Sequence, residues 1–230
     1  IASLKSKRWR IIQIEPYLPR DNIRSARYLK IMGPLLLSDY DASLWIDNSA
    51  SLKIQPSKIL EEWLRNDDIA LPDHSFRLSI AAEFDAVEAA GLDDPVRIYE
   101  QLISYSNSDS EILLEKPYWT AILARKHSKK ILAFMLRWWS HVLRYSRRDQ
   151  LSFNYAAKRE AIHPRRILID NNESEYHRWP AIKNRNRSFT SEKITSFLRT
   201  PLMDIGRLHN EITKRDQRIS ILERSIENMQ

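Results

Sequence analysis

The nine residues Tyr145–Phe153 (YSRRDQLSF) combine charged, amide and aromatic side chains in a way that suits the wall of a binding pocket. A guanidinium fork, such as that of Arg147 or Arg148, matches the oxygen atoms of a phosphate group. The carboxylate of Asp149 can accept a proton or bind a hydroxyl group, and Gln150 can orient a ligand with both a donor and an acceptor. On chemistry alone, an Arg–Asp ion pair at a helix end explains the segment equally well.

A second candidate for chemistry is Asp47, which ends the apolar run ASLWID at positions 42–47. In open α/β sheets, ligands bind beyond the carboxyl ends of the strands, and Asp47 falls at such an end. Asn48 and Ser49 follow it and offer further oxygen atoms. The alternative is an exposed aspartate that caps a turn.

Further polar residues stand close to the ends of apolar segments. They are His74, Arg77, Glu83, Glu115, Arg125 and His127. The first three form a polar group, Glu115 stands where a pocket acid would lie, and the last two end a predicted strand, where they could contact a diphosphate or a metal ion. A lone histidine is more often a core or surface residue than a catalyst, and the run RKHSKK at 125–130 would equally well begin a helix in solvent.

The elements that must position these residues alternate along the chain, which predicts an α/β fold with a largely parallel sheet. Strands are predicted at 10–14, 42–47, 68–71, 112–114 and 119–124. Helices are predicted at 25–37, 56–66, 79–90, 95–105, 128–145 and 148–161. We expect this fold to bring Asp47 and Asp149 to opposite sides of one cleft.

Several of these motifs together resemble a family of glycosyltransferase-like domains whose plant members are associated with cell-wall mucilage and turgor regulation. The resemblance covers roughly residues 9–160, in order and with plausible spacing. The matching residues are Trp45-Ile46-Asp47, Asp68-Ile69-Ala70, His74, Glu83, Tyr99, Gln101, Glu115, Arg125-x-His127 and the segment SRRDQLSF at 146–153. Because several motifs agree, the resemblance is specific.

The resemblance implies a GT-A fold, an α/β sandwich that binds a nucleotide-sugar donor, and transfer of a hexose to a glycan or another hydroxyl acceptor. The residues implied to be catalytic are Asp149, Gln150 and Glu115. The residues implied to bind substrate are Asp47, Asn48, Ser49, His74, Arg77, Glu83, Arg125, His127, Arg147 and Arg148. Within this set, the resemblance places His74 and Glu83 on the acceptor side.

The family's acidic D-x-D-like motif, which holds Mn²⁺ or Mg²⁺ through hard oxygen ligands, reads Asp47-Asn48-Ser49 in this chain. A metal site would therefore rest on Asp47 with neutral oxygens. The first strand of the GT-A fold would lie before Ile1. Both departures favour an alternative interpretation, a catalytically inactive GT-A-like module that binds or serves as a scaffold.

A nucleic-acid-binding protein is a third interpretation, because the net charge is +7 and residues 1–30 hold eight basic and two acidic side chains. Acidic residues are interleaved almost everywhere else, so no nucleic-acid partner is expected. With three glycines and no G-x-G-x-x-G or P-loop motif, the common Gly-rich phosphate loops are excluded. Without cysteine, disulfides, thiolate zinc sites and cysteine nucleophiles are excluded.

The lack of cysteine suits a reducing cytoplasm, and no apolar run approaches the ~20 residues that cross a bilayer. We expect a cytoplasmic, membrane-associated protein, or a Golgi-lumen protein if an anchor precedes Ile1 in a eukaryote.

The chain divides into an α/β domain at 1–162, a linker or flap at 163–200 and a coiled-coil helix at 201–230. Tyr176 and Trp179 could tie the flap to the domain. The helix carries isoleucine or leucine at seven-residue spacing: Ile205, Ile212, Ile219 and Ile226 at one heptad position, Leu208 and Leu222 at the other. This pattern predicts a parallel homodimer through residues 205–229, although Arg215 is a misfit. The alternative is an amphipathic helix that folds back on the domain.

Overall fold

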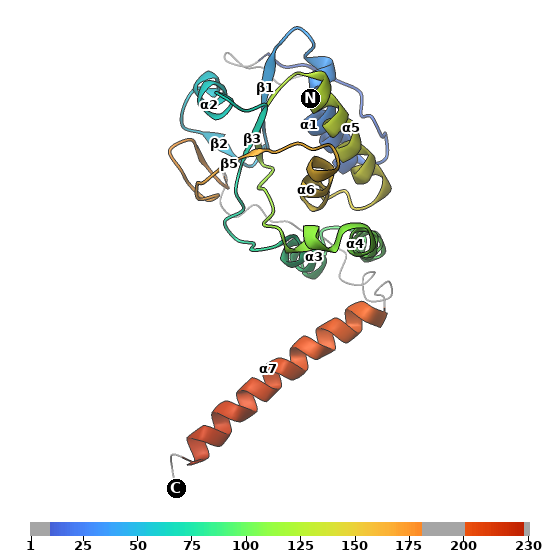
Figure 1. Cartoon of the computed structure of the whole chain (residues 1–230), viewed down its shortest axis with the longest axis vertical. Helices are drawn as coiled ribbons and strands as arrows, with labels where there is room; N and C mark the ends of the chain where they lie inside the picture. Colours follow the sequence, from blue (N-terminus) through green and yellow to red (C-terminus); the bar gives the residue numbers. More distant parts are fainter. Residues whose placement is uncertain (1–9, 181–200, 228–230) are drawn as a thin grey trace.

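The computed structural model of the chain describes residues 10–180 and 201–227. A mixed four-stranded sheet forms the centre, with the helices around it (Figure 1). In spatial order its strands are β1 (Ala42–Ile46), β4 (Ile122–Lys126), β3 (Ile69–Pro72) and β5 (Arg165–Ile167). The predicted α/β class is confirmed.

The prediction of a largely parallel sheet is wrong. Strand β4 runs antiparallel to both of its neighbours, and only β3 and β5 are parallel. Alternating strands and helices in a sequence do not fix strand direction. Here the long helical segment at 80–114 returns the chain alongside β3 in the opposite direction, with a bridge between Asp73 and Tyr118.

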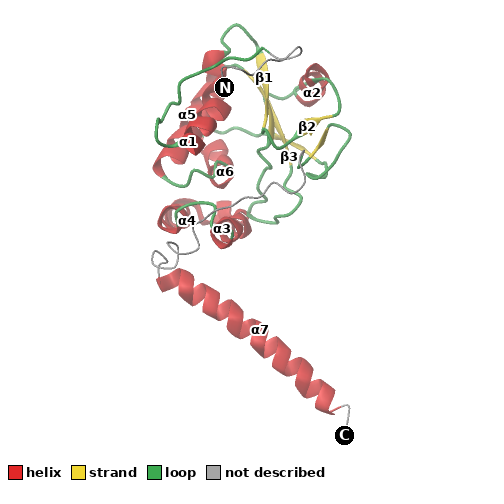
Figure 2. Cartoon of the chain, turned by 180° about the vertical axis from the view of Figure 1, so that it is seen from behind, coloured by secondary structure: helices red, strands yellow, loops and turns green. Residues whose placement is uncertain are grey.

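Helices cover both faces of the sheet (Figure 2). One face packs against α1 (Asn22–Met32), α5 (Lys129–Arg144) and α6 (Gln150–Arg159). The other face packs against α2 (Pro56–Trp63) and the small ribbon of β2 (Ser51–Leu52) and β6 (His177–Arg178). A third layer holds α3 (Ile80–Ala89), α4 (Pro95–Asp109) and the 3₁₀ helix η2 (Ser110–Leu114) against α6. A 3₁₀ turn, η1 (Gly33–Leu36), follows α1.

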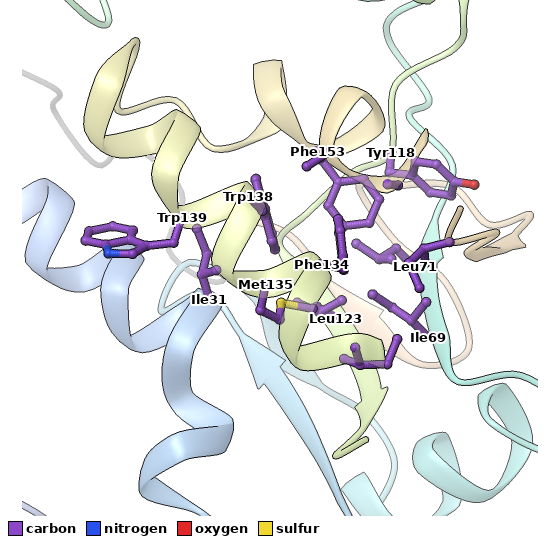
Figure 3. Packing of buried hydrophobic residues seen from close by; sticks show 14 of the residues in the cluster. Ile31, Ile69, Leu71, Tyr118, Leu123, Phe134, Met135, Trp138, Trp139 and Phe153 are labelled. Carbon is purple, nitrogen blue, oxygen red and sulfur yellow. The ribbon is translucent and has the colours of Figure 1, made fainter. Parts of the chain in front are cut away.

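Alternation along the strands divides the core between the two faces, because successive strand residues point to opposite sides. Ile69 and Leu71 face α5, whereas Ala70 belongs to the cluster around α2. On the α5 side, Phe134 and Trp138 lie one helical turn apart and are both fully buried (Figure 3). Burying an aromatic side chain of this size contributes about 1.5–3 kcal/mol, so this face of α5 holds the sheet and α6 together.

Helix starts follow the capping residues that the sequence supplies. Ser128 accepts a hydrogen bond from the backbone N–H of Ile131 and begins α5, as predicted. Asp94 caps α4 by accepting from the N–H of Val96, with a proline at the first helical position.

Two segments predicted as strands adopt another structure, and a third is a strand only in part. Residues 10–14 have irregular backbone with exposed Ile11 and Ile12, the segment 112–114 lies in η2, and only the last part of 119–124 belongs to β4. Short apolar runs are ambiguous, since the same pattern serves a buried turn or a strand. Conversely, the sequence predicts a linker or flap that includes residues 163–180, but these residues belong to the domain. Strand β5 is part of the central sheet, and β6 pairs with β2.

Helix α7 (Pro201–Glu227) is the last described element and stands apart from the sheet in Figure 1. Leu208, Ile212, Ile219 and Leu222 are exposed on it. The side chains of Ile205, Ile226 and Met229 lie outside the described residues, and the predicted coiled coil stays a prediction. Among the helices described, none has the length and apolar character needed to cross a bilayer.

Acidification should destabilise the fold through His141, whose Nδ1 lies 2.8 Å from the Tyr105 hydroxyl. Burial lowers the pKa of His141 from 6.5 to about 4, with help from the positive charges of Arg137 and Arg159. Between these two values the unfolded chain binds a proton that the folded chain rejects, so stability falls as pH drops through that window. The loss from this group is at most about 3 kcal/mol.

The measurement is urea unfolding followed by tryptophan fluorescence at pH 6.5 and at pH 4. His141→Gln keeps a hydrogen-bonding group near Tyr105 and should show a smaller loss than the unchanged chain. His163→Gln, at an exposed position, is the control. An equal loss in the unchanged chain and in His141→Gln would contradict the assignment to His141.

Candidate functional site

A cleft of about 640 Å³ opens where the carboxyl end of β1 meets the start of α6. Of the predicted site residues, its walls include Asp47, Asn48, Ser49, Arg148, Asp149 and Gln150. The expectation that the carboxylates at 47 and 149 share one cleft is confirmed. They are joined through common cations, however, and do not simply face each other across an open space.

Asp149 is held by two cations and a hydroxyl group. Lys30 Nζ lies 2.7 Å from Asp149 Oδ2, and Arg27 Nε lies 2.7 Å from Oδ1. The hydroxyl of Thr120 donates to Oδ2 at 3.0 Å and accepts a hydrogen bond from Lys30 Nζ at 3.0 Å. Burial alone would raise the pKa of Asp149, but the charges of Arg27 and Lys30 outweigh it and hold this pKa well below its usual range.

Asp47 is bound more loosely to the same cations. Its Oδ1 accepts a hydrogen bond from Trp45 Nε1 at 2.7 Å and lies 3.6 Å from Lys30 Nζ and 3.9 Å from Arg27 Nη1. Its side chain is 24% exposed, whereas Lys30 is fully buried. The two carboxylates and the two cations therefore form one cluster, hereafter the charge cluster (Arg27, Lys30, Asp47 and Asp149).

Three elements bring the charge cluster together. Arg27 and Lys30 are three residues apart on α1, so they lie on one face of that helix. Asp47 extends the pairing of β1 with β4 by one more bond, from its N–H to the carbonyl of Ala121 at 2.8 Å. The indole of Trp138 on α5 donates to the Asp149 carbonyl at 2.8 Å and fixes the start of α6.

The family-type metal ion does not fit these residues. A divalent cation needs several oxygen ligands, and Ser49, at the position of the second acid, accepts a hydrogen bond from Trp179 Nε1 at 3.1 Å. Two cations already lie within 4 Å of the Asp47 carboxylate. Across the described ranges, His, Asp and Glu side chains do not gather in groups of three or more that could bind a metal. The positive charge near Asp47 comes from the chain itself.

The two arginines of the SRRDQLSF segment point to different places. Arg147 Nε lies 3.2 Å from Asp93 Oδ1, and the backbone N–H of Arg147 donates to Asp93 Oδ2 at 2.7 Å. Arg147 is thus engaged by Asp93 in a separate hollow. Arg148 lines the cleft, and its charge acts on the carboxylates of both Asp149 and Glu83.

His74, Arg77 and Glu83 form the polar group that the sequence suggested. Arg77 Nε lies 3.1 Å from Glu83 Oε2, and His74 Nε2 lies 3.7 Å from the same oxygen. Burial raises the pKa of Glu83, while burial and the neighbouring cations lower the pKa of His74 to about 4. The group lies beside the cleft and is connected to it by Arg148, whose charge acts on Glu83.

Arg125 and His127 lie at the opposite end of the strands from Asp47. Strand β4 runs antiparallel to β1, so its carboxyl end lies beside the amino end of β1. Arg125 is 1% exposed and donates to the carbonyl of Ile31 at 3.1 Å, and burial lowers its pKa to about 9. His127 Nε2 lies 2.9 Å from the Ser43 hydroxyl. Neither belongs to the described walls of the cleft.

Glu115 is exposed and accepts a hydrogen bond from Asn154 Nδ2 at 3.0 Å, away from the described walls of the cleft. Its predicted catalytic role stays a prediction.

Sequence reasoning missed several residues that build the cleft. They are Arg27, Lys30, Trp119, Thr120 and Trp179. The basic excess of residues 1–30 and the three-residue spacing of Arg27 and Lys30 were the available signals. Burial of Lys30 depends on packing between distant segments, which spacing does not reveal.

Comparisons with known proteins identify the family of the chain. The model of the TOD1/MUCI70 glycosyltransferase-like domain matches residues 3–191. The chain belongs to this family. The probable hexosyltransferase MUCI70 of Arabidopsis thaliana is 30% identical over 156 residues, which is 64% of this chain and 27% of that protein. The chain thus spans about a quarter of that relative's length. Searching the solved structures gave no match.

Lys30→Met should destabilise the TOD1/MUCI70 domain by about 3–5 kcal/mol, because it leaves Asp149 buried with one cation fewer. Adding Asp149→Asn should recover part of that loss, since the buried charge is removed as well. Urea unfolding of both single variants and the double variant measures the coupling.

Lys53→Met is the matched control, because Lys53 pairs with Glu173 at an exposed site and should contribute less than about 1 kcal/mol. Additive losses from Lys30→Met and Asp149→Asn would show that the two side chains are not coupled.

Proposed function

We propose that this chain is a glycosyltransferase domain that moves a sugar from a nucleotide-sugar donor to a hydroxyl group of a glycan acceptor. Family membership supports glycosyl transfer in general, and the printed name of the Arabidopsis relative, a probable hexosyltransferase, supports a hexose. The observation that carries the proposal is the cleft itself. It joins two carboxylates, cations, amides and indole rings in a volume suited to a small organic substrate.

The departing diphosphate needs positive charge at the point where negative charge develops. Arg27 and Arg148 line the cleft and can offer guanidinium groups to phosphate oxygens. Lys30 lies behind them, buried and paired with Asp149, and helps to hold that carboxylate in place.

Asp149 serves in this proposal as the anion that positions the cations. A carboxylate with a pKa well below its usual range is a weak proton acceptor, and both of its oxygens are engaged. Asp47 is partly exposed and suits direct contact with a ribose or sugar hydroxyl. Asn48 and Gln150, also in the cleft wall, can orient further hydroxyl groups through their amide atoms.

A catalytically inactive binding module is the second candidate. The observation that favours it is the pairing of Asp149, which lacks the features of a base, together with Ser49 at the position of the second acid. Both candidates bind a donor, but only the transferase cleaves the bond between the sugar and the diphosphate. Slow hydrolysis of a nucleotide-sugar donor, lost in Asp47→Asn, would support the transferase. A full chain that binds a donor tightly and never hydrolyses or transfers it would support the inactive module.

Calorimetric titration of the full chain with UDP and GDP, against UMP and GMP, tests the diphosphate site. The matching diphosphate should bind at least about tenfold more tightly than its monophosphate, because the second phosphate group meets Arg27 and Arg148. Arg148→Gln should remove most of that difference.

Lys130→Gln, an exposed cation at the start of α5, is the control variant. Each titration is repeated with EDTA and with Mn²⁺. Binding that needs Mn²⁺ would assign a metal to Asp47 after all, and failure of every nucleoside diphosphate to bind would refute the donor site.

We also propose that α7 forms a parallel homodimer with a second copy of this chain. Ile212 and Ile219 repeat at seven residues and are exposed, as are Leu208 and Leu222. Arg218 and Glu223 occupy flanking positions where opposite charges of the two copies would meet, although Glu211 and Asp216 would repel.

Leu222→Asp should convert the dimer to a monomer in light scattering after size exclusion, because it places a charge in the coiled-coil seam. Ile221→Asp changes a neighbouring exposed residue outside the seam and should leave the dimer intact. Unchanged chain that is monomeric at micromolar concentration would refute the proposal.

A further inference from the structure

Two aromatic rings beside the charge cluster take no part in the proposed contacts with the diphosphate or with the hydroxyl groups of the donor. Trp179 lines the cleft, and Phe76 lies next to it with ring centroids 6.4 Å apart and planes tilted by 37°. Phe76 is 44% exposed and Trp179 is partly exposed. The two rings, hereafter the aromatic strip, lead from the cleft towards the surface.

Trp179 is held in place within the aromatic strip by two hydrogen bonds and a ring contact. The indole N–H of Trp179 donates to the Ser49 hydroxyl at 3.1 Å, and its ring packs edge-on against Trp119, with centroids 5.9 Å apart. The backbone N–H of Trp179 donates to the carbonyl of Asn172 at 2.6 Å. Fixing an exposed ring before a ligand arrives lowers the entropy cost of binding.

The segment that carries Phe76 is joined to the segment that carries Trp179 by one fully buried amide. Asn171 Oδ1 accepts from the N–H of Ser75 at 2.7 Å, and Asn171 Nδ2 donates to the carbonyl of Asp73 at 2.8 Å. The N–H of Asn171 donates to the Ser75 hydroxyl at 2.9 Å. Residues nearly a hundred positions apart are thus locked together, which sets the relation of the two rings.

Sugar rings suit this surface. A pyranose has apolar C–H faces and hydroxyl groups at its rim, so it stacks on an aromatic ring while its rim meets polar groups. On one side of the strip are Asp47 and Gln150 in the cleft. On the other side, Phe76 packs edge-on against His74, which belongs to the polar group with Arg77 and Glu83.

The proposed donor does not need Phe76. The cleft of about 640 Å³ falls within the range of roughly 300–1,000 Å³ that is usual for sites of small organic ligands. Phe76 is not part of the described wall of the cleft, so its exposed ring is available to a second substrate.

We propose that the acceptor is an extended neutral glycan that lies along the aromatic strip, with at least one sugar unit on Phe76 and the next on Trp179 at the mouth of the cleft. This inference rests on the proposed function, because it assigns the acceptor of the same reaction. Arg77, the partly exposed member of the polar group with His74 and Glu83, binds hydroxyl groups of the outer unit.

The experiment is titration of the full chain with neutral oligosaccharides, from monosaccharide to hexasaccharide, in the glucan, xylan, mannan and galactan series. The chain has seven tryptophans, so a change in tryptophan fluorescence is assigned to Trp179 where Trp179→Phe removes it. In at least one series, affinity should rise about tenfold from the monosaccharide to the trisaccharide, as a second ring becomes engaged. Phe76→Ala should abolish most of this gain and leave the binding of UDP and GDP unchanged.

Leu78→Ala is the matched control, because Leu78 is 86% exposed two residues further along. The inference is overturned if every series binds without length dependence, or if Phe76→Ala keeps the same dependence. It is also overturned if Phe76→Ala weakens UDP or GDP binding, which would assign the strip to a nucleotide base. If nucleoside diphosphates bind but the glycans show no length dependence, this inference alone is refuted. If nucleoside diphosphates do not bind, the donor site is refuted.

Discussion

The buried ion pair between Lys30 and Asp149 is the interaction on which the candidate site depends. Moving either charge out of water costs several kcal/mol, and that cost is offset only when both partners and their hydrogen bonds are in place. Lys30 comes from α1, Asp149 from the start of α6, and Thr120, which bridges them, from the segment before β4. Correct docking of three distant segments is therefore a condition for a stable cleft.

Local sequence predicted the parts of the site that local structure determines. Asp47 ends a strand and Asp149 begins a helix, as the local patterns predict, and the two lie in one cleft as expected. The predicted site role of Arg125 and His127 failed for a non-local reason. Both residues lie at the end of β4, as predicted, but β4 runs antiparallel to β1, which puts that end far from Asp47.

The fold shows the same division between local and non-local information. The apolar face of α5 and its Ser128 cap are visible in the sequence, and the helix forms where the pattern predicts. Residues 163–180 were not recognised as part of the domain, because the strands β5 and β6 are very short and rich in charged residues. Their place is set by partners far away in the chain, such as β3 and β2, and by Asn171, which ties Ser75 to this segment.

The two cations lie closer to Asp149 than to Asp47, and this difference indicates where a ligand can enter the charge cluster. The formal charges of its two cations and two carboxylates cancel, so a diphosphate gains little from long-range attraction to the cluster alone. Contacts to Asp149 are short and buried, whereas those from Arg27 and Lys30 to Asp47 are 3.9 and 3.6 Å long beside a partly exposed carboxylate. A ligand can replace the contacts to Asp47 at low cost while Asp149 keeps both cations oriented. Asp149 is therefore the carboxylate that fixes the cations, and Asp47 is the one whose contacts are longer and more easily exchanged.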